Sequence, residues 1–289
     1  MQGAVGELGF LNVDGARVRY LRAGSGRPLL LIHGIVGAAE NWRRNIPALA
    51  EHATVYALDL VGMGKSERVP GLAAGLEETA RRVLATMDAL RIARADVAAV
   101  SHGGAVAMTM AAIAPERVRS LILLAPANPY STAADWLVRL YSSRLGAAVA
   151  PIAPRLPRWV HQIALARMFG DRGRIPEGCL KPYREALRVP GTMRHVMAIV
   201  RLWFADMEKL RGMLPQVAKT PTLLLWGDKD CAVSVESGRR LKQELGAELV
   251  VFPGGGHLVY EEFADEVNRV MVDWLGRSVG GDLEELPRP

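Results

Sequence analysis

Near-continuous apolar runs alternate with helix-like segments along most of this chain, and this rhythm restricts its fold more than any other feature. The runs are rich in Val, Leu, Ile and Ala, without the regular polar positions of a sheet that faces water. They begin at Pro28, Thr54, Ala95, Arg119, Thr220 and Ala247. The helix-like segments occupy about residues 39–50, 77–91, 103–114, 234–245 and 261–276. The pattern predicts an α/β protein with a doubly wound, mostly parallel sheet.

Two parts of the chain depart from this rhythm. The stretch GFLNVDGARVRYLRAG has two alternating halves around a Val-Asp-Gly turn, which predicts an antiparallel hairpin at the edge of the sheet. Between about residues 128 and 217, helical segments punctuated by proline take over. We therefore predict a core formed by residues 1–127 and 218–289, with an inserted helical cap at 128–217. A chain of 289 residues is long enough to bury such a core.

The positive charge of the chain is concentrated in the cap. The formal net charge at pH 7 is +6 overall, whereas residues 128–215 hold 14 Lys and Arg against 6 Asp and Glu. Trp136, Trp159 and Trp203 lie among these basic residues. A solvated helical surface with apolar inner faces explains this pattern, and so does weak attraction to an acidic substrate or an anionic membrane surface. No nucleic-acid-binding motif accompanies the charge, so we expect no nucleic-acid partner, and the oligomeric state stays open.

Cysteine usage and the first residues bear on the compartment. Cys179 and Cys231 are the only cysteines, which argues against a disulfide framework and fits a reducing environment. The opening MQGAVGELGF has neither the basic nor the apolar region of a secretory signal. Runs such as LGAAVAPIAP are too short and too interrupted by proline to span a bilayer. These features predict a cytoplasmic location.

The stretch AAVSHGGAVA has the features of a nucleophile elbow, in which a catalytic serine lies on a tight turn between a strand and a helix. Ser101 follows an apolar run, with Ala99 two residues before it and Gly103 two residues after it. Small flanking residues are needed because this turn brings the neighbouring strand and helix close together. Ala99 replaces the usual first glycine, so the pattern is weak by itself and the partners of the serine decide the matter.

A hydrolytic serine needs a histidine base and an acid that orients the histidine. Asp228 and Asp230 follow the run TLLLW, and His257 follows the run ELVVFP in a glycine-rich loop. Both runs are expected to end at the carboxyl edge of the sheet, as the run before Ser101 does, and this edge is where open α/β sheets form their sites. The chain order Ser, Asp, His matches a known order of the catalytic triad.

The loop IHGIVG supplies a further part of the predicted site. It follows an apolar run and can direct the backbone N–H of Ile35 toward the serine. With the backbone N–H of His102, it would form a two-donor oxyanion hole for the negative charge that develops during acyl transfer. The imidazole of His102 could also protrude into the pocket, and the sequence leaves that open.

Five motifs together resemble the α/β-hydrolase superfamily: HGIVG, DLVGMGKS, SHGGAVA, WGDKD and GGGHLVYEE. The resemblance covers residues 7–278. It implies that Asp230 rather than Asp228 is the acid, and that the inserted cap is the family's helical lid. It also implies that Trp42 is the aromatic residue common after the oxyanion loop, and that GMGKS is a structural turn. A P-loop is excluded there because Asp59 stands where the first glycine is needed.

The predicted site also has a substrate pocket. The residues expected to line it are His33, Gly34, Trp42, Asn128 and Leu258. We expect the His33 side chain to hold its loop by hydrogen bonds rather than to act on substrate. No metal-binding spacing connects the remaining histidines, which are His52, His161 and His195. Neither a metal nor a cofactor is expected.

Taken together, these residues predict a serine hydrolase that cleaves a carboxylic ester, lactone or thioester of a small to medium hydrophobic molecule through an acyl-enzyme. Its partner would be a small-molecule ester. C–C hydrolases of the same fold tend to have Trp after the catalytic histidine, where this chain has Leu258. Cofactor-free oxygenases place their acid after the sixth strand, where this chain has Asn128. A ligand receptor on the hydrolase scaffold also stays open, since such proteins can retain the triad.

Overall fold

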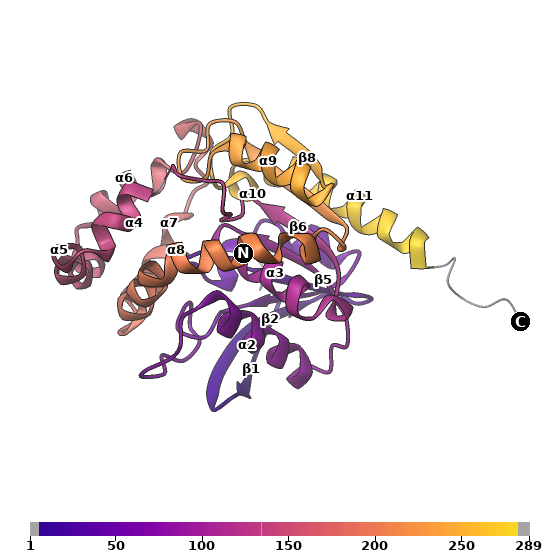
Figure 1. Ribbon diagram of the computed structural model, residues 1–289, viewed down its shortest axis with the longest axis horizontal. Coiled ribbons are helices and arrows are strands. Elements are labelled where there is room, and N and C mark those ends of the chain that lie inside the picture. Colours follow the sequence, from indigo (N-terminus) through magenta and orange to yellow (C-terminus); the bar gives the residue numbers. More distant parts are fainter. Residues whose placement is uncertain (1–5, 134, 283–289) are drawn as a thin grey trace, which may run out of the picture.

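The computed structural model describes residues 6–133 and 135–282, and its centre is an eight-stranded sheet with helices on both faces (Figure 1). The strand order is β1-β2-β4-β3-β5-β6-β7-β8, in which β3 to β8 run parallel and β2 pairs antiparallel with both neighbours. The strands are β1 (Glu7–Val13), β2 (Ala16–Ala23), β3 (Pro28–Ile32), β4 (Thr54–Leu58), β5 (Ala95–Val100), β6 (Val118–Leu124), β7 (Thr222–Gly227) and β8 (Glu248–Phe252). The predicted doubly wound, mostly parallel sheet is confirmed.

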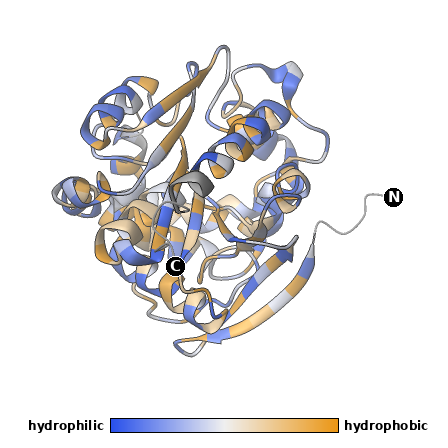
Figure 2. Ribbon diagram, turned by 90° about the vertical axis from the view of Figure 1, so that its right-hand side faces the viewer, coloured by the Kyte–Doolittle hydropathy of each residue, from blue (hydrophilic) through white to orange (hydrophobic). Residues whose placement is uncertain are grey.

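The core helices cover both faces of this sheet. They are η1 (Ala39–Trp42), α1 (Ile46–Ala50), α2 (Leu76–Ala89), α3 (His102–Ile113), η2 (Pro115–Arg117), α9 (Val235–Leu245), α10 (Val259–Glu262) and α11 (Ala264–Asp282). In β3, Leu30 and Ile32 pack into the cluster that includes α2, α3 and α9, whereas Leu29 and Leu31 pack into the cluster that includes α1 and α11. Because both faces are buried, both sets of positions are apolar, which explains the near-continuous runs (Figure 2).

Two local features refine the sequence expectations. The hairpin β1–β2 forms as predicted, and both turn residues, Asp14 and Gly15, have positive φ, as a tight two-residue turn requires. The segment expected as one helix at 39–50 is instead two short helices, η1 and α1. The second begins anew at Ile46 because Pro47 lacks a backbone N–H and favours the first turn of a helix.

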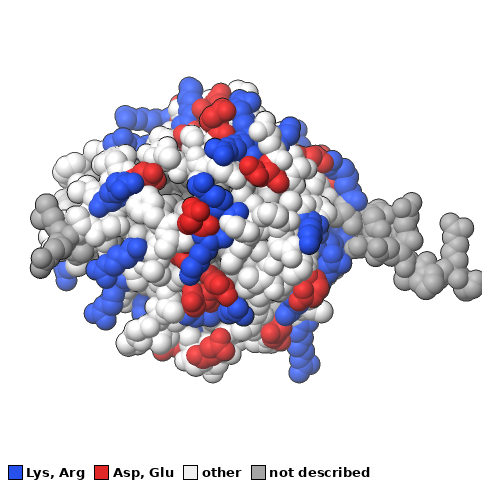
Figure 3. Space-filling model, viewed as in Figure 1, with Lys and Arg blue, Asp and Glu red and all other residues white. Residues whose placement is uncertain are grey.

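A helical segment lies between β6 and β7, in the region predicted as the cap. It contains α4 (Asp135–Ser142), α5 (Arg144–Val149), η3 (Ala150–Arg155), α6 (Arg158–Ala166), η4 (Arg172–Arg174), α7 (Leu180–Arg188) and α8 (Thr192–Val217). Helices α4, α5 and α6 form one end of the molecule, whereas α8 crosses α3 (Figure 1). Lys and Arg side chains gather over this end, at the left of Figure 3. No helix in the described ranges is long and apolar enough to cross a membrane.

The order of the strands determines where a site can form. The chain moves from β3 to β4 on one side and then returns to place β5 on the other side of β3. Ligands of open α/β sheets bind at such a reversal, beyond the carboxyl ends of the strands. Gly34 and Ser101 follow the two strands that flank this point.

Candidate active site

Ser101 occupies a strained turn between β5 and α3. Its φ of 54° and ψ of −124° lie in a region that non-glycine residues avoid, at a cost of about 1–3 kcal/mol. The surrounding backbone holds this conformation: the Ser101 N–H donates to Leu124 O at 3.1 Å, and its carbonyl accepts from Gly104 N and Ala127 N, both at 2.9 Å. Strained residues of this kind persist only where other contacts stabilise them, and they concentrate at functional sites.

Close packing around the turn explains the small residues that flank the serine. A Cβ atom at Gly103 would lie 2.4 Å from the carbonyl oxygen of His33, so a side chain there would collide with the oxyanion loop. A Cβ at Gly34 would lie 3.1 Å from the Cβ of Ser101, which places that loop directly beside the nucleophile. Ala99 is fully buried in β5, and its methyl group is accommodated there.

The acid and the histidine meet at the same edge of the sheet. His257 Nδ1 and Asp230 Oδ2 are 2.8 Å apart, and the Asp230 side chain is fully buried. Asp230 Oδ1 accepts hydrogen bonds from the backbone N–H groups of Ala232 at 2.8 Å and Val233 at 2.9 Å, so the carboxylate is fixed. Asp228 is exposed and instead accepts from Gly254 N at 2.7 Å. Of the two aspartates considered, the structure therefore brings Asp230 to the histidine.

This pairing orients the imidazole for base chemistry. With Nδ1 donating its hydrogen to the carboxylate, the other ring nitrogen of His257 is left as the acceptor that a serine hydroxyl requires. Within the described ranges, the Ser101 hydroxyl makes no hydrogen bond. Serine–histidine contacts in unliganded enzymes are often long and shorten when substrate binds. The chain thus presents a free hydroxyl and an oriented base.

The loop that follows β3, which we call the oxyanion loop, carries the Ile35 N–H, one of the two predicted donors of the oxyanion hole. Gly37 N donates to Gly34 O at 3.0 Å, which closes a turn around Ile35. The N–H groups of Ile35 and His102 have no hydrogen-bond partner in the part of the chain that the structure describes. Two unpaired N–H groups at the ends of β3 and β5 are the donors that an oxyanion hole needs.

His33 holds this loop in place. Its ring is fully buried; Nδ1 donates to Gly34 O at 2.7 Å, and Nε2 accepts from the N–H of Leu60 at 3.1 Å. Burial lowers the pKa of His33, so its imidazole stays neutral. Both ring nitrogens are occupied, as expected for a structural histidine.

Three other residues predicted for the pocket, Trp42, Asn128 and Leu258, are buried. Trp42 is fully buried with its ring 4.8 Å from that of Tyr260, and Leu258 is 6% exposed. The Asn128 amide donates to Pro126 O at 3.0 Å and Ser237 Oγ at 3.1 Å, while its oxygen accepts from Tyr130 N at 3.0 Å. These contacts fix the Asn128 side chain, and contact between the predicted pocket residues and substrate stays a prediction.

His102 is an unusual neighbour of the nucleophile. The side chain is 1% exposed, and neither ring nitrogen has a hydrogen-bond partner among the described residues. Burial first, and then the nearby His195 and His33, lower the pKa of His102 to about 3. The imidazole beside Ser101 is therefore neutral at physiological pH.

A strap of the helical segment, residues 167–171, holds the loop that carries His257. The N–H of His257 donates to Met168 O at 2.7 Å. The Glu262 carboxylate accepts from Gly256 N at 2.8 Å in the loop, and from Gly170 N at 3.1 Å and Asp171 N at 2.9 Å in the strap. Sequence reasoning missed Glu262, although it lies within the quoted motif GGGHLVYEE. Its acidic pair is equally typical of the first turn of a helix, so the pattern gives no separate signal.

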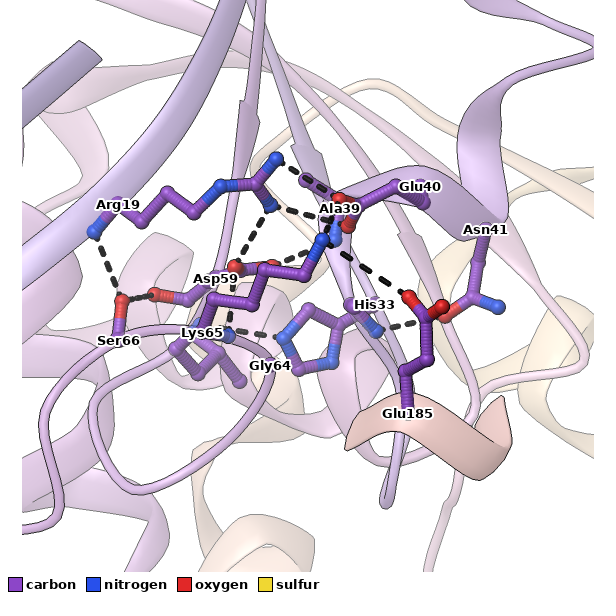
Figure 4. Close-up of polar contacts among 12 residues, drawn as sticks. Arg19, His33, Ala39, Glu40, Asn41, Asp59, Gly64, Lys65, Ser66 and Glu185 are labelled. Carbon is purple, nitrogen blue, oxygen red and sulfur yellow. Dashed lines mark hydrogen bonds and ion pairs between the residues drawn. The ribbon is translucent and has the colours of Figure 1, made fainter. Parts of the chain in front are cut away.

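A buried ion-pair network supports the oxyanion loop from the other side (Figure 4). Asp59, fully buried at the end of β4, accepts from Ala39 N at 2.6 Å, Lys65 N at 2.8 Å and Arg19 Nη1 at 2.9 Å. The Glu40 carboxylate pairs with both Arg19 and Lys65 at 2.8 Å. The GMGKS stretch is therefore a structural turn, held by backbone and side-chain contacts to Asp59.

Comparison with known proteins agrees with this geometry. The family model of the alpha/beta hydrolase fold matches residues 27–264, so the chain belongs to that family and is a hydrolase of the α/β fold. The dihydrolipoyllysine-residue acetyltransferase component of the acetoin cleaving system of Pseudomonas putida is 33% identical over 267 residues, which are 91% of this chain and 68% of that protein.

Two further relatives represent different chemistries. The 2-hydroxy-6-oxo-2,4-heptadienoate hydrolase of Pseudomonas putida is 27% identical, covering 87% of this chain and 90% of that protein. The solved structure of a membrane phospholipase A, a bacterial virulence factor, is 28% identical with a TM-score of 0.75, covering 95% of this chain and 87% of that chain. The family is thus shared by proteins that cleave different bonds.

Within the described ranges, no group of three or more His, Cys, Asp or Glu side chains has the arrangement of a metal site.

Proposed function

We propose that this chain is a serine hydrolase that attacks a carbonyl group with Ser101, and that its substrate is a carboxylic ester, lactone or thioester of a hydrophobic molecule. The observation that carries the proposal is the 2.8 Å contact between His257 and Asp230, together with the strained Ser101 turn at the same sheet edge. A fixed acid, an oriented base and an accessible hydroxyl are the parts that nucleophilic catalysis requires.

The first step forms the acyl-enzyme. Ser101 Oγ attacks the carbonyl carbon while its proton moves to His257 Nε2, and the buried Asp230 stabilises the imidazolium. The negative charge on the carbonyl oxygen is held by the N–H groups of Ile35 and His102. When the tetrahedral intermediate collapses, the C–O bond to the alcohol breaks, or the C–S bond to the thiol in a thioester, and His257 gives its proton to the departing oxygen or sulfur.

The second step releases the acid. A water molecule gives a proton to His257 Nε2 and its oxygen attacks the acyl carbon. The bond to Ser101 Oγ then breaks, and the serine oxygen regains the proton from His257. The products are one acid and one alcohol from an ester, one acid and one thiol from a thioester, or one hydroxy acid from a lactone.

Cleavage of a carbon–carbon bond is the second candidate. The Pseudomonas putida hydrolase, 27% identical over 90% of its length, is named for a dienoate, and its name supports this candidate. The same serine, histidine and oxyanion donors would act on a ketone carbonyl, with a carbon leaving group that must receive the proton. Leu258, directly after His257, favours the ester over the carbon–carbon bond, and the phospholipase relative supports the same choice.

A cofactor-free oxygenase and a ligand receptor have less support. The oxygenase would need an acid after β6, but that position holds Asn128, whose amide is committed to Pro126, Ser237 and Tyr130. A ligand receptor would keep the triad and turn over slowly. Repeated turnover with product in excess of protein contradicts a receptor.

The experiment compares two substrate classes on the same protein. p-Nitrophenyl esters from acetate to long acyl chains, and 2-hydroxy-6-oxo-2,4-heptadienoate, are offered to the wild type and to Ser101→Ala. We expect steady ester turnover that the variant loses by about 10³-fold or more. If only the dienoate is consumed, the carbon–carbon candidate replaces the ester. If neither variant nor wild type consumes either class, the ester and dienoate proposals both fail.

A further inference from the structure

The helical segment between β6 and β7, which we call the cap, exposes more large apolar side chains than the rest of the described chain. The helices at the end of the molecule carry Trp136 at 65% exposure, Trp159 at 62% and Ile163 at 54%. Leu140, Val149 and Ile152 lie between them, at 46–50% exposure. Outside the cap, the large exposed apolar side chains of the described residues are Leu8 and Phe10, on the edge strand β1. Isolated exposed side chains are ordinary, but a concentration on one end of a protein indicates an interaction surface.

These side chains lie on helices that contact one another. His161 of α6 bonds to Ala153 O of η3 at 2.8 Å, and Ser142 Oγ of α4 donates to Val200 O of α8 at 3.3 Å. The guanidinium of Arg139 lies 4.8 Å from the ring of Phe204, a further exposed aromatic on α8. Helices α4, α5 and α6 also share one end in Figure 1. We call this end, from Trp136 to Phe204, the cap surface.

Two segments of the cap surface carry positive charge without acidic residues. Residues 136–170 contain five arginines and no Asp or Glu, and residues 186–205 contain three arginines and no Asp or Glu. Along the sequence, the arginines alternate with exposed apolar residues. Neither segment contains a carboxylate side chain, so its positive charge is available to an anionic partner.

A groove beside this surface is lined by four of the arginines. It has a volume of about 540 Å³ between η3, the end of α7 and the start of α8, and Arg155, Arg188, Arg194 and Arg201 line it. No acidic side chain contributes to its wall, and among the described residues none of the four forms an ion pair. The remaining wall is apolar, including Met193 and Met197. Such a groove can accept a phosphate group beside an aliphatic chain.

We propose that the cap surface docks onto an anionic phospholipid bilayer, with the arginine groove receiving lipid headgroups. Trp, Ile, Leu and Val would enter the boundary between headgroups and acyl chains, while the arginines pair with phosphate. Basic side chains near an anionic surface are attracted to it, and the two segments supply several of them. A nucleic acid would use the arginines but would leave the aliphatic side chains in water. The proposal is independent of the chemistry at Ser101.

The geometry also connects this surface with the active site. Arg194 in the groove lies on α8, and α8 packs against α3, whose first residue is His102. A bilayer on the cap surface would therefore lie over the helix that covers the residue next to the nucleophile.

The test measures co-sedimentation of the full chain with vesicles of phosphatidylcholine alone or mixed with phosphatidylglycerol. We expect binding that requires phosphatidylglycerol, weakens with salt, and is unchanged in Ser101→Ala. The double variant Trp136→Ser/Trp159→Ser and the double variant Arg188→Glu/Arg194→Glu should each bind about tenfold or more weakly. The matched control Leu8→Ser/Phe10→Ser removes the exposed apolar pair on β1 and should bind like the wild type.

Three results would overturn this assignment. Absence of binding to phosphatidylglycerol vesicles contradicts docking altogether. Binding that the cap variants retain, or that the β1 control loses, places the contact elsewhere. Self-association that Trp136→Ser/Trp159→Ser abolishes, without vesicle binding, shows that a second copy covers the surface instead. Each variant is checked for folding by its thermal unfolding, and loss of folding in one pair leaves the other pair to decide.

Discussion

At the residue scale, burial controls the protonation of two histidines, His102 beside the nucleophile and His195 on α8. His102 and His195 are 1% and 7% exposed, and burial is the main cause that lowers their pKa values to about 3 and about 4. Both values lie below the ordinary histidine pKa of about 6.5. The folded protein therefore keeps both rings neutral at a pH where the unfolded chain takes up protons.

This difference predicts a loss of stability in acid. The contribution of each histidine is fully present above about pH 6.5 and falls as the pH is lowered toward the folded-state pKa. Between pH 7 and pH 5, the free energy of unfolding should fall by about 2 kcal/mol for each of the two groups. Urea unfolding at both pH values measures the fall, and in His195→Gln it should be smaller by about one such increment. An exposed control, His52→Gln, should behave like the wild type, and an equal fall in all three proteins would contradict the prediction.

Sequence patterns identified some site residues better than others. Ser101, Asp230 and His257 could be placed at one sheet edge, since each follows an apolar run that a parallel sheet must align. The orientation of a side chain depends on packing from elements far along the chain. That is why the buried ring of His102, the committed amide of Asn128 and the loop contacts of Glu262 could not be predicted.

At the element scale, the strap 167–171 and the loop that carries His257 form one unit through Glu262. The Glu262 carboxylate accepts hydrogen bonds from three backbone N–H groups, and Glu262 is 7% exposed. An amide in its place has one oxygen instead of two, so at least one of the three N–H groups would lose its acceptor, at a cost of about 1–3 kcal/mol where that group is the buried N–H of Gly256.

Glu262→Gln should therefore impair the position of His257. We expect kcat on the best substrate to fall about tenfold with little change in KM, because the base is misplaced while substrate binding is kept. Glu266→Gln, an exposed substitution on the following helix, is the matched control and should leave both constants unchanged. If Glu262→Gln lowers the melting temperature but not kcat, Glu262 supports the fold and does not position the base.

Strands and helices could be predicted from the sequence where a single physical cause determines them. Burial on both faces makes β3, β5, β6 and β7 continuous in apolar residues, so their existence and direction could be predicted. The break between η1 and α1 was missed because it depends on a local proline, Pro47, inside a segment whose apolar spacing is helical throughout.

At the scale of the whole molecule, charged networks join segments that are distant in the chain. Asp59 connects β2, η1 and the GMGKS turn, while Lys65 reaches Glu185 of α7 at 3.9 Å. Arg68 extends the connection to α8 by donating to Thr192 Oγ1 at 2.8 Å. The oxyanion loop and the helical segment thus share one polar framework.

Removing the centre of this framework should destabilise the whole fold. Asp59→Ala leaves the Arg19 guanidinium, whose side chain is 6% exposed, with only the partly exposed Glu40 as partner. It also removes the acceptor of the Ala39 and Lys65 N–H groups, and the free energy of unfolding should fall by about 3–5 kcal/mol. Glu248→Ala breaks the Arg277–Glu248 pair, whose side chains are 57% and 53% exposed, and should cost less than about 1 kcal/mol. Urea unfolding compares the two variants, and similar losses would contradict a special role for the buried network.

The most direct test of the central claim is covalent labelling by a fluorophosphonate, read by intact mass and peptide mapping. Ser101 Oγ would attack phosphorus as its proton passes to His257 and fluoride leaves. We predict one label on the wild type, located at Ser101, and none on Ser101→Ala. Asp230→Asn should label about 10²–10⁴-fold more slowly, while Asp228→Asn labels at the wild-type rate. An unlabelled wild type, or a slower Asp228→Asn than Asp230→Asn, would contradict a serine activated by His257 and Asp230.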